Sequence, residues 1–143
     1  MIREIKASDL HDEYFSLLSQ LSGDASGYDP KALWDLYIEM KPNIITFVNV
    51  DDSKNVTGSA TIFVENKFLH GGSRVGHIED VVVNKEKRTK GLGKSLVEQC
   101  VDFAKTMGCY KVILDCEEDN IPFYAKCGFI PASYSMRHSI KAG

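Results

Sequence analysis

The sequence has no apolar run long enough to cross a bilayer and no strong excess of one charge. A membrane-spanning helix needs about 20 consecutive apolar residues, and no segment of this chain approaches that length. The 17 Lys and Arg residues nearly balance the 20 Asp and Glu residues, for a net charge of −3. Because this balance gives no general attraction to nucleic acid or to an anionic membrane, we expect neither as a partner.

Cysteine is scarce, and its spacing is not that of a zinc site. The four cysteines are Cys100, Cys109, Cys116 and Cys127, with no Cys-x-x-Cys pair. His77 and His138 have no convergent third ligand in the sequence, so no metal is expected. Each cysteine lies in or beside a predicted helix or strand, which indicates free buried thiols in a reducing compartment. The N-terminus carries no signal-peptide apolar region, so we expect a cytoplasmic protein.

The hydrophobic pattern is that of one α/β domain over residues 1–143. With 43% hydrophobic residues, the composition is typical of a globular domain of common size. Apolar spacing predicts strands over residues 1–6, 44–50, 58–64, 76–83, 110–116 and 129–140. It predicts helices over about 9–21, 30–40 and 91–107, and a short one between 120 and 128. Residues 110–116 are almost uninterruptedly apolar, which is typical of a strand covered on both faces.

A basic, glycine-containing segment lies between a predicted strand and the strongest predicted helix. Five of the ten residues 85–94 are Lys or Arg, and Gly91 and Gly93 lie among them. Backbone N–H groups at a helix N-terminus bind anions, and glycine lets a diphosphate approach the backbone closely. The segment has neither a Walker motif nor the full dinucleotide fingerprint. Taken alone, it equally fits a tight turn with solvated lysines.

The motifs of this segment and of three others resemble a known family. Arg88-Thr89-Lys90-Gly91-Leu92-Gly93 fits the Arg/Gln-x-x-Gly-x-Gly/Ala signature of the GNAT superfamily of acyl-CoA N-acyltransferases. Residues 76–83, 108–116 and 120–129 resemble the glucosamine-6-phosphate N-acetyltransferase family within it. The resemblance implies a GNAT fold, with a mixed central sheet whose parallel strands splay apart and are flanked by helices. It also implies direct acetyl transfer from acetyl-CoA to the amine of glucosamine 6-phosphate, in UDP-N-acetylglucosamine synthesis.

The resemblance implies a cofactor site between residues 78–83 and 110–116. There the pantetheine arm would pair with main-chain groups like an added strand, while the diphosphate reaches the glycine-containing segment. The valine side chains themselves are expected to pack in the core. The implied cofactor residues are Val81, Val82, Val83, Thr89, Lys90, Gly91, Leu92, Gly93, Lys94, Asn120 and Tyr124. Asn120 equally suits a helix cap.

Two residues are implied as catalytic. Tyr124 would protonate the departing thiolate, because a phenol with a pKa near 10 remains a proton donor at neutral pH; packing against neighbouring aromatic rings is the alternative. Glu79 would accept the ammonium proton, with main-chain carbonyls and water as rivals. In a regular strand Glu79 and Asp80 point to opposite faces. A salt bridge, or a β-bulge that turns both carboxylates to solvent, is the structural alternative.

The sugar phosphate needs further groups, some of them from a second subunit. The implied substrate residues are Ser22, Lys67, Phe68, Leu69, His70, Glu79, Asp80, Val81, Tyr110, Lys111, Asp115 and Arg137. Arg137 is offset by two residues from the family's C-terminal arginine, which keeps it on the same strand face. The edge expected at residues 132–140 favours a homodimer with shared sites.

Two other functions compete with this one. The first is acetyl transfer to another small amine or to a protein lysine. The second is a non-catalytic module that binds acyl-CoA or nucleic acid, for which the basic segment is the only support.

Overall fold

The computed structural model describes residues 1–87 and 90–141 of the chain. In that part, one mixed sheet has the strand order β1-β2-β3-β4-β5. Neighbouring strands pair antiparallel from β1 to β4, and β4 pairs with β5 in parallel. The strands are β1 (Ile2–Glu4), β2 (Ile44–Val50), β3 (Val56–Asn66), β4 (Arg74–Val83) and β5 (Cys109–Ile113). The helices are η1 (Ala7–Asp9), α1 (Asp12–Ser19), α2 (Pro30–Met40), α3 (Leu69–Gly72), α4 (Leu92–Thr106), η2 (Glu118–Asn120) and α5 (Ile121–Lys126).

Local signals in the sequence set the ends of the longer helices. The Asp29 side chain accepts hydrogen bonds from the N–H groups of Lys31 and Ala32, and Pro30 occupies the first turn of α2. Both features favour a helix start at this point. Helix α4 is followed by Gly108 with a φ of 78°, a left-handed conformation that glycine adopts readily at a helix C-terminus. The predicted helices 30–40 and 91–107 are therefore confirmed.

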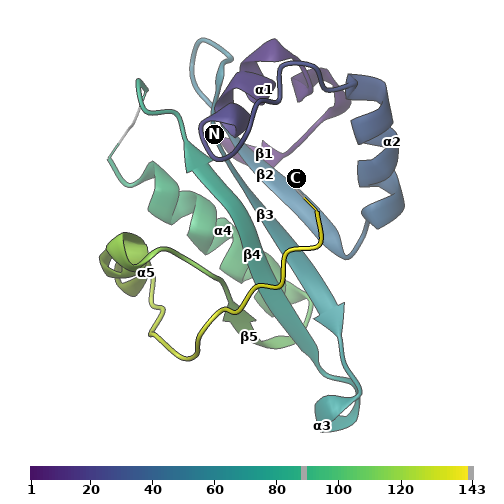
Figure 1. Ribbon diagram of the computed structural model, residues 1–143, viewed down its shortest axis with the longest axis vertical. Coiled ribbons are helices and arrows are strands. Elements are labelled where there is room, and N and C mark those ends of the chain that lie inside the picture. The colour runs from purple at the N-terminus through teal and green to yellow at the C-terminus, as the bar shows by residue number, and fades with distance from the viewer. Residues whose placement is uncertain (88–89, 142–143) are drawn as a thin grey trace.

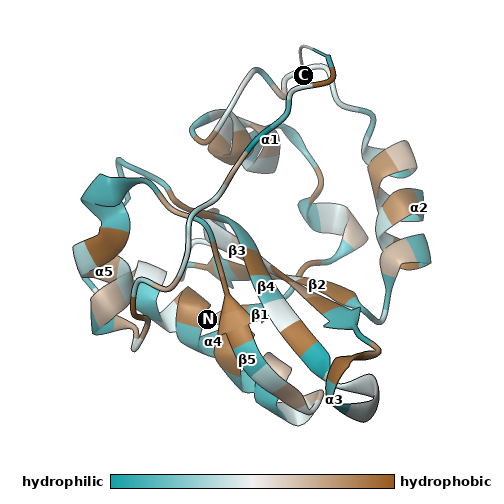
Figure 2. Ribbon diagram, turned by 60° about the horizontal axis from the view of Figure 1, so that its bottom comes forward, coloured by the Kyte–Doolittle hydropathy of each residue, from teal (hydrophilic) through white to brown (hydrophobic). Residues whose placement is uncertain are grey.

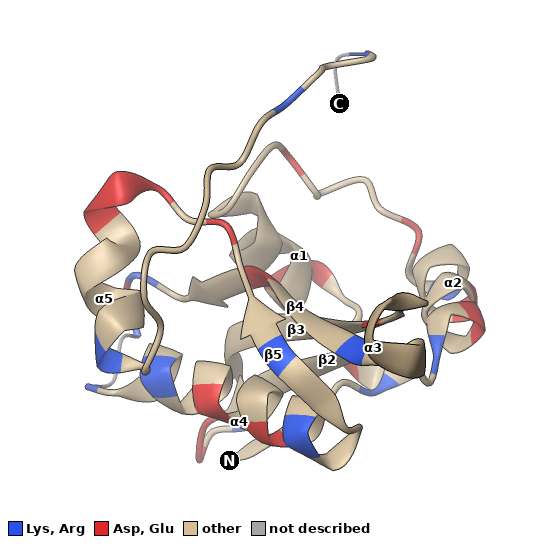
Figure 3. Ribbon diagram, turned by 90° about the horizontal axis from the view of Figure 1, so that it is seen from below, with Lys and Arg blue, Asp and Glu red and all other residues tan. Residues whose placement is uncertain are grey.

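Helix α4 covers one face of the sheet with an apolar core. Its Leu96, Val97 and Cys100 are fully buried and belong to one cluster with Ile62 and Ile78 of the sheet. Figure 3 shows α4 on this face and α1 and α2 on the other. Figure 2 shows the hydrophobic residues of the central strands between these layers. Full burial of such a side chain contributes about 1.5–3 kcal/mol each.

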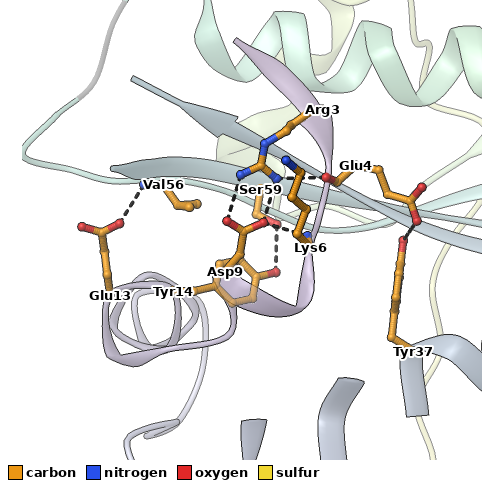
Figure 4. Close-up of polar contacts among 9 residues, drawn as sticks. All are labelled: Arg3, Glu4, Lys6, Asp9, Glu13, Tyr14, Tyr37, Val56 and Ser59. Atoms are coloured by element: carbon orange, nitrogen blue, oxygen red, sulfur yellow. Dashed lines mark hydrogen bonds and ion pairs between the residues drawn. The ribbon is translucent and has the colours of Figure 1, made fainter. Parts of the chain in front are cut away.

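The opposite face is fastened to α1 and α2 by buried polar groups as well as by apolar packing (Figure 4). The Tyr14 hydroxyl lies 3.0 Å from the Ser59 hydroxyl, and the Tyr37 hydroxyl donates to Glu4 at 2.8 Å. Burial raises the pKa of both phenols, so both stay protonated and can donate. These bonds tie each helix to a defined strand of the sheet.

A buried ion pair closes the N-terminal edge of the sheet. The Arg3 guanidinium donates to both Asp9 oxygens, at 2.7 and 2.9 Å, and the Lys6 N–H donates to the same carboxylate at 2.7 Å. Burial by itself raises the pKa of Asp9, but these hydrogen bonds outweigh it and hold the pKa below its ordinary value. The ionised carboxylate therefore fixes η1 against β1.

The C-terminal part of the chain differs from the prediction. Residues 129–141 form no strand and run clear of the sheet (Figures 1 and 3). Beyond the half-buried Phe129, their apolar side chains are exposed, with Tyr134 97% and Met136 94% accessible. A strand needs a neighbouring strand for its N–H and C=O groups, and residues 130–141 pair with no strand in the described part of the chain. The predicted last strand over residues 129–140, and with it an edge at 132–140, is therefore wrong for the chain described here.

Strand β5 is also shorter and more exposed than predicted. It ends at Ile113 rather than Cys116, and Tyr110 and Ile113 are 47% and 39% exposed. The cause is its position as the last strand of the sheet, paired with β4 on one side alone among the described residues, while α4 packs on one of its faces. The prediction of a strand covered on both faces is therefore wrong. Cys116, in the segment after β5, is exposed, whereas Cys100 is buried and Cys109 and Cys127 are half-buried.

Candidate active site

The two parallel strands pair over a short stretch and then part. The ladder between β4 and β5 runs from Arg74 and Cys109 to His77 and Ile113. Strand β4 continues to Val83, and this second half is paired with β3 alone among the described residues. Backbone N–H and C=O groups on its β5 side are thus free to pair with an amide-bearing ligand. The structure therefore contains the splayed parallel strands that the sequence predicts.

A β-bulge interrupts β4 within its free half. Thr61 of β3 faces Glu79, but Ser59 faces Val82, so β4 holds one residue more than β3 in this interval. Asp80 has a φ of 53°, a left-handed conformation that Asp tolerates better than most residues. Both Glu79 and Asp80 are exposed. The strand is not regular here, and the β-bulge alternative is the one the structure shows.

Two other carboxylates influence Glu79. Partial burial of its carboxyl group raises the pKa of Glu79, and the negative charges of Asp80 and Asp115 raise it further. Figure 3 shows this acidic character continuing from the end of β5 into η2. A carboxylate with a raised pKa is a stronger base than an ordinary glutamate, and the group as a whole favours a cationic substrate.

In the valine segment, Val81 to Val83, the side chains and the main chain have different roles. Val81 and Val83 pack their side chains against the α4 core cluster, and Val82 is buried with the α1 and α2 cluster. The side chains are therefore core residues, as expected. Only the backbone groups of the free half of β4, among the groups of these three residues, are therefore available to a ligand.

The glycine-containing segment ends in an anion-binding geometry. Gly91 is the N-cap of α4, with a φ of 83° and no side chain that caps the helix. The first N–H groups of an α-helix have no partner within the helix, so those of Leu92, Gly93 and Lys94 can receive a phosphate. Lys90 and Lys94 add positive charge at this end. This geometry fits the diphosphate of CoA. Arg88 and the predicted cofactor residue Thr89 lie outside the described residues.

Leu92 and Lys94 have side-chain partners of their own. The Leu92 side chain is 8% exposed and lies in the α4 core cluster, so its backbone alone is available to a ligand. The Lys94 ammonium lies 3.8 Å from the Glu98 carboxylate one turn further along the helix, and both side chains are about half exposed. Such an exposed pair contributes little to stability, so Lys94 remains free to turn to an anion.

Tyr124 lies in α5, beside the open end of the two strands. Burial raises its pKa, and the Cys116 and Cys127 thiols raise it further, so the phenol holds its proton throughout the neutral range. Cys127 lies three residues after Tyr124, a helical spacing that brings two side chains together, whereas no sequence signal marks Cys116 as a neighbour of Tyr124. Asn120 is the N-cap of α5 without a side-chain capping bond, which leaves its amide free for a ligand.

The predicted cationic residues meet at the opposite end of β4. The Tyr110 ring contacts the His70 ring at 5.0 Å between centroids, and the Lys111 ammonium lies 5.5 Å from the Tyr110 centroid. His70 belongs to α3, the turn between β3 and β4 (Figure 1). Phe68 and Leu69 of the same turn are exposed. Lys67 lies 3.8 Å from Glu65, which also binds His77 at 2.9 Å.

The remaining predicted substrate residues are not brought to this cluster. Ser22 lies exposed just after α1, and Arg137 lies in the exposed C-terminal segment. In the described ranges 1–87 and 90–141, no three His, Cys, Asp or Glu side chains are arranged to hold a metal ion. No helix within these ranges is both long and apolar enough to cross a membrane.

Comparison with known proteins shows which family has this sequence and fold. Residues 7–129 match the acetyltransferase (GNAT) family. The glucosamine 6-phosphate N-acetyltransferase of Arabidopsis thaliana is 37% identical over 138 residues, which cover 94% of this chain and 93% of that protein. Its namesake from Trypanosoma brucei brucei is 37% identical over 139 residues, covering 95% and 92%. The crystal structure of the Arabidopsis enzyme superposes with a TM-score of 0.90 at 34% identity, over 99% of this chain and 98% of that one. The fold and the sequence agree, and the chain belongs to the GNAT family of acetyltransferases.

Proposed function

We propose that the protein transfers the acetyl group of acetyl-CoA to the amine of D-glucosamine 6-phosphate, giving N-acetyl-D-glucosamine 6-phosphate and CoA. The observation that carries this proposal is the agreement among its relatives. Proteins from a plant, a trypanosome and a yeast that share 36–37% identity with nearly the whole chain carry this one activity in their names. The product would serve UDP-N-acetylglucosamine synthesis.

The acidic group at the bulge suits the amine end of this substrate. Glu79 accepts a proton from the ammonium group, directly or through water, and the neutral amine then attacks the thioester carbonyl. A backbone N–H near Val81 stabilises the developing oxyanion. Asp80 and Asp115 raise the pKa of Glu79 and can bind sugar hydroxyls. A new C–N bond forms as the C–S bond breaks.

Tyr124 completes the transfer by donating its phenolic proton to the departing sulfur, and the proton that the new amide nitrogen loses restores the phenol, directly or through water. Its raised pKa supports this role, because the phenol is fully protonated before the reaction. Acetyl-CoA supplies an activated thioester, and the free half of β4, with Gly91, Gly93 and Lys94, supplies its binding groups. No covalent acyl-enzyme is needed in this scheme, since the amine is itself the nucleophile.

The phosphate of the substrate points to a second subunit. Lys111 pairs with Val75, and Glu79 lies four residues further along β4, about 13 Å away at roughly 3.3 Å per residue. The Glu79 carboxylate and the Lys111 ammonium therefore extend from well-separated backbone positions, which favours phosphate binding by cations of a second subunit. We therefore propose a homodimer in which Lys67, His70, Lys111 and Arg137 serve the neighbouring site. The exposed C-terminal segment and β5 edge supply surface for this contact.

Subunit mixing tests the shared site. Tyr124→Phe and Lys111→Ala variants, each inactive alone, should regain activity when mixed and allowed to exchange subunits. Each mixed dimer then has one site without either change. A fully active monomer in sedimentation at the assay concentration would contradict the shared site.

A thiol-release assay tests the reaction itself. With acetyl-CoA present, glucosamine 6-phosphate should release CoA far faster than glucosamine or a lysine peptide. Comparable rates for glucosamine would show that the phosphate is not recognised. Turnover confined to the peptide would favour the alternative, an acetyltransferase for protein lysine.

A further inference from the structure

Glycine is favoured at positions 91 and 93, the two glycines of the signature, for different structural reasons. A Cβ on Gly91 would meet nothing within 4 Å, but its φ of 83° requires a residue that adopts left-handed backbone readily. A Cβ on Gly93 would lie 3.1 Å from Cζ of Phe123 and 3.7 Å from Cγ2 of Val83. Carbon atoms pack at about 3.5–4.0 Å, so the Phe123 ring occupies the space that a side chain at position 93 would need.

Three elements of the active site meet at this contact. Val83 ends the free half of β4, Gly93 lies in the first turn of α4, and Phe123 belongs to α5. The α4 core cluster includes both Val83 and Phe123 at its border. The absent side chain at Gly93 therefore sets how closely α5 approaches the anion-binding end of α4.

Phe123 in turn contacts the residue that carries the chemistry. Its ring stands edge-on to that of Tyr124, with centroids 4.9 Å apart and planes at 76°. The Phe129 ring makes a second edge-on contact with Tyr124 at 6.1 Å, and its N–H donates to the Tyr124 carbonyl at 3.0 Å. Edge-to-face geometry is the favoured arrangement of aromatic pairs, so these two rings fix the plane of the phenol.

We propose that Gly93 acts on catalysis through Phe123, by giving this ring the position from which it orients Tyr124. Phe123 is then a positioning residue, because its ring lies against Gly93 where a side chain would otherwise project. The proposal rests on the acid role of Tyr124 in the proposed function.

A double-mutant cycle tests this proposal. Gly93→Ala should displace the Phe123 ring by a few tenths of an ångström and lower kcat by roughly 10-fold, less than the loss of about 100-fold that a misplacement of 1 Å can cause. Affinity for CoA, measured by calorimetry, should change little, because the new methyl group meets Phe123. In a Tyr124→Phe background, the same substitution should change kcat by less than about threefold, since this variant has no hydroxyl group whose orientation could matter. Gly91→Ala is the contrast, and should weaken CoA binding instead.

A second readout does not depend on turnover. In protein labelled with 3-fluorotyrosine, the resonance lost in Tyr124→Phe identifies Tyr124, and Gly93→Ala should shift that resonance in the free protein. If Gly93→Ala does not fold, Phe123→Leu, which demands no new space, enters the same cycle. Wild-type kcat in the substituted protein, or an equal loss of kcat with and without the Tyr124 hydroxyl, would overturn the proposal. A wild-type protein inactive on glucosamine 6-phosphate would instead overturn the proposed function.

Discussion

The two halves of β4 differ in what surrounds their backbone. From Arg74 to His77 the strand is paired on both sides, with β3 and with β5. From Ile78 to Val83 it is paired with β3 alone, among the described residues, and carries the bulge. Gly76 in the first half is buried, whereas Glu79 and Asp80 in the second half are exposed.

The difference teaches where this fold can hold reactive groups. A strand with two ladders has no free N–H or C=O groups, and its side chains are fixed by both neighbours. A strand with one ladder keeps one row of main-chain groups for a ligand and allows an irregular residue such as Asp80. Changes in the paired half should therefore reduce stability, and changes around the free half should reduce activity.

The largest expected effect is at Tyr124, beside the free half. Tyr124→Phe keeps the ring contacts with Phe123 and Phe129 but removes the proton, so kcat should fall by roughly 10²–10⁴-fold with little change in cofactor affinity. Tyr134→Phe is the matched control, because Tyr134 is 97% exposed. Equal activity of both variants in steady-state kinetics would reduce Tyr124 to a packing residue.

Gly76→Val tests the paired half. A Cβ at this position would lie 3.1 Å from Ile62 Cδ1, 3.2 Å from Ala104 Cβ and 3.3 Å from Val112 Cγ2. Such overpacking costs about 1–3 kcal/mol, so the free energy of unfolding should drop while the kcat of the folded fraction is retained. Gly27→Val is the control, since a Cβ there meets nothing within 4 Å. Urea denaturation of the two variants checks the expected difference, and equal midpoints would contradict it.

Asp80 tests whether the bulge is strained. Left-handed backbone costs an ordinary residue about 1–2 kcal/mol, so Asp80→Val should destabilise the fold by about that amount and Asp80→Gly should not. Thermal unfolding without ligand measures the difference. A valine variant as stable as the glycine variant would show that the bulge relaxes at no cost.

The smallest effect concerns the charges around Glu79. Because Asp115 helps to raise the pKa of Glu79, Asp115→Asn should lower that pKa. A base works only when deprotonated, so the acidic limb of the pH profile of kcat should move to lower pH. Glu117→Gln, in the same exposed stretch, is the charge-matched control. An unmoved limb with Asp115→Asn would leave main-chain carbonyls or water as the proton acceptor.

Local patterns in the sequence predict the interior of this fold well. Strand β2 and helix α2 begin and end at the predicted residues, because a short apolar run, a capping aspartate and a proline are all local signals. The glycine-containing turn and the splayed strands also follow from the motifs and their resemblance, whereas the approach of Asp80 and Asp115 to Glu79 does not.

The features that local sequence patterns do not predict depend on residues that are distant in the chain. The apolar character of residues 110–116 and 129–140 predicts strands, but whether a strand forms depends on a neighbouring strand. The bulge at Asp80 is visible only in the register with β3. The contact between Gly93 and Phe123 joins residues thirty positions apart, and no periodicity reports it.

The strand order has a consequence for how the protein is made. Every ladder joins strands that are consecutive in the chain, so each strand leaving the ribosome finds its partner already present. The antiparallel sheet from β1 to β4 can therefore assemble during synthesis, before α4, β5 and α5 emerge. Parallel pairing must wait for the helical crossover and is intrinsically slower. We expect the antiparallel sheet of the nascent chain to fold first and the elements α4, β5 and α5 to fold last, since folding follows synthesis from the N-terminus.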